Sequence, residues 1–146
     1  MPGQGCEEAD QGIMHAETTT TGGVKVRITL LAAGFIIGPI GGCIREISRI
    51  SSAEIRSRTV AADSLCCRDC REFSIEGATE ASVALALAII IEAVKRYKDL
   101  CEGCCAGQVV SRSQQVMGVE FFYQPPPRSI VPFAACLKGH SKYAYY

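Results

Sequence analysis

The feature that most limits how this chain can fold is a run of isoleucines interrupted by glycines, GFIIGPIGGCIREI, at residues 34–47. Glycine weakens a helix interior by about 1 kcal/mol relative to alanine, so glycines at this density serve a backbone conformation or a close approach to the main chain. A helix predicted over residues 31–37 ends at Gly38-Pro39, because the residue before proline avoids the helical region. A second helix is predicted from after Gly41 to Ser51-Ser52. The segment therefore predicts two short helices joined by a loop of bare backbone.

Alternating apolar and polar residues on both sides of this segment predict strands. VKVRITL at residues 24–30 has the period-two pattern of a strand with one buried face. AEIRSRT at residues 53–59 and REFSIEG at residues 71–77 give two more, with Phe73 and Ile75 expected to point inward. Thr79 is a candidate N-cap for an almost wholly apolar helix of about twenty residues. The predicted order is strand, helix, helix, strand, strand, helix.

The length of 146 residues allows one small domain with extensions. Residues 1–23 are acidic, end in TTTTGG and lack apolar periodicity, which predicts a disordered N-terminal tail. Residues 24–100 are the predicted domain. Residues 101–146 are expected to be an extension that is partly ordered or mobile, with VEFFYQ as a candidate edge strand.

From residue 24 to residue 58 the sequence resembles the KH domain pattern, G-x-I-I-G-x-x-G-x-x-I-[KR]-x-I followed by a small-residue turn and an isoleucine strand. The matching residues are Gly34, Ile36, Ile37, Gly38, Gly41, Ile44, Arg45, Ile47, Ala53 and Ile55. REFSIEG and the helix after it are similar to the later elements of the family, in its type I, eukaryotic order. The resemblance covers residues 24–100 and implies an α+β, type I KH fold: a three-stranded antiparallel sheet with three helices on one face.

The same resemblance implies a module that holds about four single-stranded nucleotides, with the GxxG loop clamping the phosphate backbone. The first two helices and the loop would form one wall, and the second strand with the loop after it would form the other. Bases would rest on an aliphatic floor, for which Ile36, Ile37 and Ile44 are candidates. They would be read by the backbone of the second strand around Ile55 and by Arg56. The residues implied for RNA binding are Gly34, Ile36, Ile37, Gly38, Pro39, Ile40, Gly41, Gly42, Ile44, Arg45, Arg49, Ile55, Arg56 and Arg58.

Pro39 departs from the family, which usually has Lys or Arg at this position. The loop therefore lacks its own cation and one N–H donor. It carries no acidic residue, so the departure weakens phosphate binding rather than excluding it, and Arg45 and Arg49 remain as candidate phosphate partners. The isoleucines also have a core interpretation, because so small a domain needs its aliphatic residues for packing. The arginines of the predicted site also have an alternative interpretation, because exposed arginines usually belong to the solvated surface.

Composition argues against several other functions. The formal net charge is +0, so a polyanion must be met locally. The N-terminus has neither the basic nor the apolar region of a secretory signal, and we expect a nuclear or cytoplasmic protein. The longest apolar run, residues 83–91, is about half of a membrane span, so no membrane partner is expected. No catalytic motif is visible, and we expect no enzyme.

Nine cysteines at irregular spacing argue against a disulfide framework. Cys67-x-x-Cys70 and Cys101-x-x-Cys104 both have metal-ligand spacing, and the long helix could return one pair toward the other. The gap between the pairs fits no recognised zinc finger. We expect no metal and no other cofactor, with free thiols as the ordinary interpretation.

The sequence favours a single-stranded RNA-binding KH module of a post-transcriptional regulator, with single-stranded DNA as the less favoured ligand. The alternative is a degenerate KH-like scaffold that contacts protein partners, or a second copy in a dimer, through its sheet or the segment FFYQPPP. Pro39 and the zero net charge favour the scaffold. The otherwise intact helix-loop-helix favours RNA.

Overall fold

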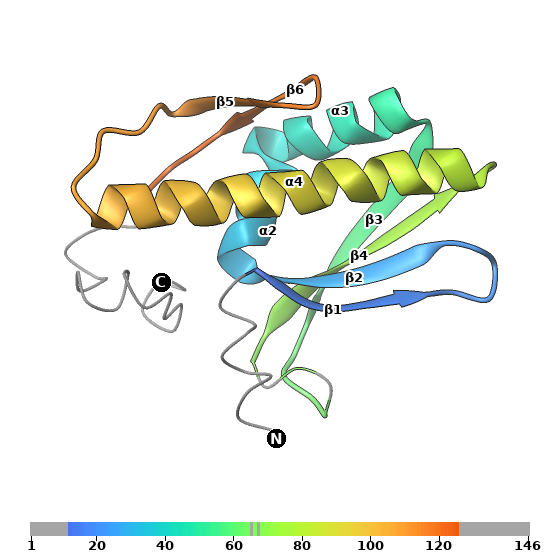
Figure 1. Ribbon diagram of the computed structural model, residues 1–146. Helices are drawn as coiled ribbons and strands as arrows, with labels where there is room; N and C mark the ends of the chain where they lie inside the picture. Colours follow the sequence, from blue (N-terminus) through green and yellow to red (C-terminus); the bar gives the residue numbers. More distant parts are fainter. Residues whose placement is uncertain (1–11, 65, 67, 126–146) are drawn as a thin grey trace.

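The predicted order of strands and helices is present in the computed structural model, which describes residues 12–64, 66 and 68–125 (Figure 1). A sheet forms one layer, three helices cover one of its faces, and a small hairpin lies over the helices. The elements are β1 (Ile13–Thr18), β2 (Val24–Thr29), α2 (Leu30–Ile37), the 3-10 turn η1 (Pro39–Gly41), α3 (Gly42–Ser51), β3 (Ala53–Val60), β4 (Cys70–Gly77), α4 (Glu80–Cys105), β5 (Ser113–Val116) and β6 (Val119–Phe122).

The main sheet is antiparallel with the strand order β1-β2-β4-β3. Its last three strands and α2, α3 and α4 confirm the type I KH fold, but the sheet has four strands rather than three. The expectation of a disordered tail is wrong over Ile13–Thr18, which pairs with β2 as β1. The low-complexity TTTTGG supplies the connecting turn, closed by a hydrogen bond from Thr19 N to Gly23 O of 2.8 Å. Residues 1–11 lie outside the described residues.

The core lies between the sheet and the helices. Phe73 and Ile75 point inward from β4, as predicted, and both are fully buried. Thr79 caps α4 as expected, because its Oγ1 accepts a hydrogen bond from Ser82 N at 3.1 Å. The helix is longer than predicted and ends at Cys105, so the expected domain boundary at residue 100 falls inside it. In the described part of the chain no single helix is long and apolar enough to cross a membrane. The bent pair Leu30–Ile37 and Pro39–Ser51 reaches the required length and apolar composition only when the two helices are taken together.

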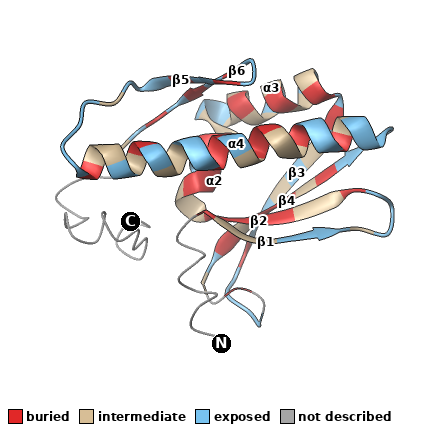
Figure 2. Ribbon diagram, viewed as in Figure 1, coloured by how far each residue is buried: buried red, intermediate tan, exposed pale blue. Residues whose placement is uncertain are grey.

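The C-terminal extension packs onto the helices through the hairpin β5–β6. VEFFYQ does contain a strand, but β6 pairs with β5 in a separate two-stranded sheet instead of extending the main one. Val119, Phe121 and Tyr123 alternate inward and are almost completely buried (Figure 2). The Phe121 ring stacks on Phe35 of α2 with 5.1 Å between ring centroids. The extension that the sequence left open as covering or mobile therefore covers the core as far as residue 125, and residues 126–146 lie outside the described residues.

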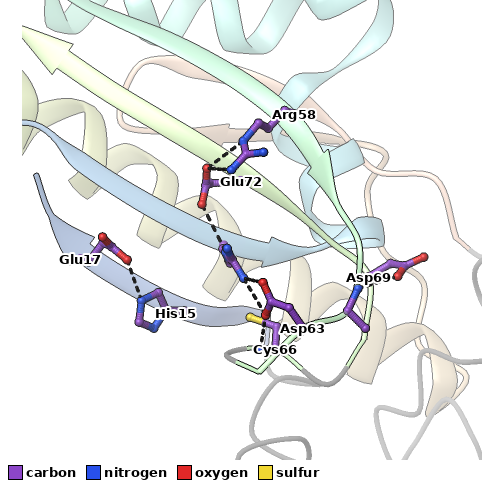
Figure 3. Close-up of polar contacts among 9 residues, drawn as sticks. His15, Glu17, Arg58, Asp63, Cys66, Asp69 and Glu72 are labelled. Atoms are coloured by element: carbon purple, nitrogen blue, oxygen red, sulfur yellow. Dashed lines mark hydrogen bonds and ion pairs between the residues drawn. The ribbon is translucent and has the colours of Figure 1, made fainter.

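The open face of the sheet carries a network of ion pairs (Figure 3). Arg27 is only 8% exposed and Glu72 only 5%. Arg27 Nε donates to Glu72 Oε2 at 3.2 Å and Arg27 Nη1 to Asp63 Oδ2 at 3.0 Å, while Arg58 Nε donates to the other oxygen of Glu72 at 3.0 Å. The bond to Asp63 raises the pKa of Arg27 above its ordinary value. Asp63 also accepts from Cys66 N, so the network ties the β3–β4 loop to the sheet.

Candidate nucleic-acid interface

The loop between α2 and α3 stands out from the helix layer with an unusual backbone. Gly38, Ile40 and Gly41 have φ angles of 74°, 54° and 71°, all in the left-handed range. Gly38 is obligatory, because a Cβ there would overlap the Cys43 side chain. Ile40 is β-branched and 92% exposed, so its conformation is strained without any gain from burial. The predicted loop of bare backbone is therefore present, and its tip faces solvent.

Few N–H groups of the loop are available to a ligand. Gly38 N donates to Gly34 O at 3.0 Å and Gly41 N to Gly38 O at 3.1 Å, while Pro39 has no N–H. Gly42 N donates to Pro39 O. These bonds shape the turn and leave the Ile40 N–H as the candidate donor of the loop.

The nearest cation to the loop is Arg45. Its Nη1 donates to the Ile40 carbonyl at 2.7 Å, so the guanidinium lies beside the loop tip. Arg49, one turn further along α3, pairs instead with Glu46 through two hydrogen bonds. The structure thus brings Arg45 to the loop and holds Arg49 against a carboxylate on its own helix.

The isoleucines that match the KH pattern divide into two groups. Ile36 and Ile47 are fully buried, so Ile36 belongs to the core and not to an accessible surface. Ile37, Ile44 and Ile55 are half-buried and pack against the core with part of each side chain exposed. These three are the apolar surface that remains for a base. Gly34 and Gly42 leave room beside it, because a Cβ at either would meet no atom within 4 Å.

The arginines of β3 lie on the other face of the sheet. Ile55 is opposite Ile75 on the core side, so Arg56 and Arg58 point to the open face. Arg56 pairs with Glu54 at 2.9 Å, and with Lys25 and Ser74 it lines a hollow of about 210 Å³. Arg58 pairs with Glu72. The structure therefore separates these two arginines from the GxxG loop, and their contact with bases stays a prediction.

The hairpin places residues next to the loop that the sequence did not nominate. Cys43 Sγ donates to the Glu120 carbonyl at 3.3 Å and so joins α3 to β6. Phe122 follows on the outward side of β6 and is 48% exposed. The alternation of Val119, Phe121 and Tyr123 with these outward residues was visible in the sequence, but the position of the hairpin beside the loop was not.

The cysteines do not assemble as the zinc alternative requires. Cys70 packs with Val60 and Cys66 on the open face, whereas Cys101 and Cys104 pack against the main core. Cys67 lies outside the described residues, and within them no three His, Cys, Asp or Glu side chains are placed to hold a metal ion. Burial raises the pKa of Cys70 to about 11, and Cys105 is disulfide-bonded, so the expectation of free thiols is wrong at that position.

A GxxG loop that joins two helices above a type I antiparallel sheet defines the KH class of nucleic-acid-binding modules. Residues 23–92 match the family model of the KH domain, which identifies this segment as a KH domain. No curated protein and no solved structure matched the chain. The match begins one residue before β2 and ends inside α4, so β1 and the hairpin lie outside it. KH domains bind single-stranded nucleic acid and are not enzymes.

Proposed function

We propose that this chain is a single-stranded RNA-binding module of a post-transcriptional regulator, acting in the nucleus or cytoplasm, and that its GxxG loop clamps the phosphate backbone. The observation that carries the proposal is the exposed loop with the Arg45 guanidinium fixed beside its tip, 2.7 Å from the Ile40 carbonyl. An exposed backbone turn with an adjacent cation is the arrangement that a phosphate group requires.

Arg45 can serve as the cation that Pro39 does not provide. A guanidinium has five N–H donors, and the bond to the Ile40 carbonyl uses one of them. That bond orders the side chain before any ligand arrives, which lowers the entropy lost on binding. Among the described residues Arg45 has no carboxylate partner, so no ion pair has to break first.

Bases would lie between the loop and β3, over the exposed parts of Ile37, Ile44 and Ile55. No strand pairs with the outer edge of β3 in the described part of the chain, so its backbone N–H and C=O groups are available to base edges. Arg49 would add a phosphate contact by exchanging its exposed carboxylate partner, because such a surface ion pair is worth about 0–1 kcal/mol.

The test compares four forms of the full chain by fluorescence anisotropy with a randomised tetranucleotide RNA pool and the corresponding DNA pool. Pro39→Asp combined with Ile40→Asp should abolish binding, because two charges would face the phosphate. Pro39→Asn with Ile40→Asn is the matched control of similar shape and should bind like the wild type. Pro39→Lys should tighten binding and steepen the dependence of log affinity on log salt by roughly 0.7.

Unchanged affinity of a folded double-aspartate variant would remove the phosphate clamp from the proposal. Equal or stronger binding of the DNA pool would make DNA the ligand. The second candidate function, a KH scaffold for protein contacts, is favoured by the exposed apolar side chains of Ile40 and Phe122. The absence of binding by the wild type to either pool would make this scaffold the better account.

A further inference from the structure

A second concave surface lies on the flank of α3 that faces the hairpin. We call it the hairpin cleft; its volume is about 500 Å³, and Pro39, Gly42, Glu46, Gln115, Glu120 and Phe122 contribute to its lining. Such a volume is within the range of pockets for small molecules, roughly 300–1,000 Å³. Pro39 and Gly42 belong to the loop proposed to hold phosphate, so a strand held at the loop passes the rim of the cleft.

Phe122 is an aromatic residue at an outward position of the hairpin, beside the cleft. The inward positions of β6 are apolar and buried, and the outward positions of strands β5 and β6 are otherwise polar, with Ser113, Gln115 and Glu120. A phenyl ring at an outward position, 48% exposed, loses part of the gain that burial would give. Among the described aromatic side chains its ring stacks on none. The exposed half of the side chain is therefore available for stacking.

Contacts of the Cys43 side chain connect the hairpin cleft to the GxxG loop. The Cys43 thiol donates to the Glu120 carbonyl at 3.3 Å, and the same side chain fills the space that makes glycine necessary at position 38. Ser113 Oγ donates to the Glu120 carboxylate and fixes that side chain on the outward face. The position of Phe122 relative to the GxxG loop is thus set by contacts within the fold.

The charges of the cleft select which part of a nucleotide can enter. Glu46 and Glu120 would repel a phosphate, and the hydrogen bond from Arg49 lowers the pKa of Glu46, which keeps that carboxyl ionised. A nucleobase is neutral and stacks on aromatic rings, and cytosine and adenine carry an amino group that can donate a hydrogen bond to a carboxylate. A base therefore fits this surface, whereas the phosphate that follows it belongs on the loop.

We propose that the hairpin cleft binds one unpaired base of the RNA strand just beyond the nucleotides held at the GxxG loop, with that base stacked on Phe122. The proposal rests on the proposed RNA-binding function and extends the recognised length of the strand. Phe122 and the other hairpin residues of the cleft lie outside the residues matched to the KH family, so one wall of the extra site is built by this chain's own C-terminal hairpin.

The experiment measures affinities of the full chain for randomised RNA pools of four and ten nucleotides. Phe122→Ala should weaken binding of the ten-nucleotide pool by at least about fivefold, since stacking is worth that much or more, and should leave the four-nucleotide pool unchanged. Phe122→Tyr keeps the ring and should bind like the wild type. Phe122→Leu keeps an apolar side chain without the ring and should bind like Phe122→Ala. The loss should not vary with salt, because no phosphate contact is removed.

Thermal midpoints of the three variants establish that each is folded. Equal losses for the two pools, no loss for either, or wild-type affinity of Phe122→Leu would each overturn the stacking site. Those results leave the phosphate clamp standing, because the double-aspartate variant tests it separately on the four-nucleotide pool. A wild type that binds neither pool would overturn both proposals.

Discussion

Two neighbouring phenylalanines on opposite faces of β6 give a direct test of whether the C-terminal hairpin belongs to the folded domain. Phe121 is fully buried and its ring stacks on Phe35 at 5.1 Å, while Phe122 is 48% exposed. Replacing a buried phenylalanine by alanine costs about 3–5 kcal/mol, because apolar burial is lost and a cavity remains. Replacing the half-exposed Phe122 ring should cost about 1 kcal/mol, because full burial of such a side chain is worth about 1.5–3 kcal/mol and only half of this one is buried.

Urea unfolding followed by circular dichroism measures both variants against the wild type. With a slope of about 2 kcal/mol per molar urea, Phe121→Ala should lower the midpoint by about 2 M and Phe122→Ala by about 0.5 M. A folded domain of this size has a free energy of unfolding of about 5–15 kcal/mol, so Phe121→Ala should be only marginally stable. Equal midpoints for the two variants would refute the reasoning, since the hairpin would then add nothing to the core. A change of slope in Phe121→Ala alone would show that the hairpin detaches before the rest unfolds.

Two further predictions concern the loop and the network on the open face. Ile40→Asn should raise the free energy of unfolding by about 1 kcal/mol, because asparagine tolerates the left-handed conformation and little burial is lost at a side chain 92% exposed; a thermal midpoint that does not rise would show that the loop is unstrained. Burial raises the pKa of Glu72, but hydrogen bonds from Arg27 and Arg58 outweigh burial and hold that pKa below its ordinary value. Glu72→Gln should therefore lower the free energy of unfolding by about 3 kcal/mol at pH 7. This is the low end for a broken buried ion pair, because Arg27 still has Asp63 as a partner. The difference in stability between Glu72→Gln and the wild type should shrink as the pH falls from about 4.3 through the lowered pKa of Glu72. Chemical denaturation between pH 7 and pH 3 measures it, and a constant difference would contradict the assignment.

The sequence predicted the elements whose pattern is local. Strands β2, β3 and β4 have a period-two alternation, and Gly38-Pro39 marks the end of α2, so each could be placed from neighbouring residues alone. The edge strand β1 could not, because its residues are half-exposed and its order comes from pairing with β2. Strand β5 has the polar sequence SQQV and forms only against β6. Order that depends on a tertiary partner leaves little trace in a local pattern.

The candidate site shows the same division. The bare loop followed from the glycines and Pro39, and Arg45 was nominated through the KH pattern, but its hydrogen bond to the Ile40 carbonyl was not predicted. The pairs Glu46–Arg49 and Glu54–Arg56 could have been predicted from spacing on one helix face or one strand face. The placement of Ile36 in the core could not be separated from a place in the floor, since both positions demand an aliphatic residue. The contact of β6 with Cys43 joins residues far apart in the chain, and no spacing rule predicts it.

The hairpin changes what the functional unit of this chain is. The family match ends inside α4, yet Phe121 stacks on a helix that leads into the GxxG loop, and Cys43 bonds to the strand that carries Phe121. The Cys43 side chain packs against Gly38 and donates a hydrogen bond to Glu120 of the hairpin. A shift at either contact therefore displaces the other, because closely packed interiors transmit small displacements. The conformation of the loop and the packing of the hairpin are therefore linked, so the loop depends on the hairpin as well as on the matched segment.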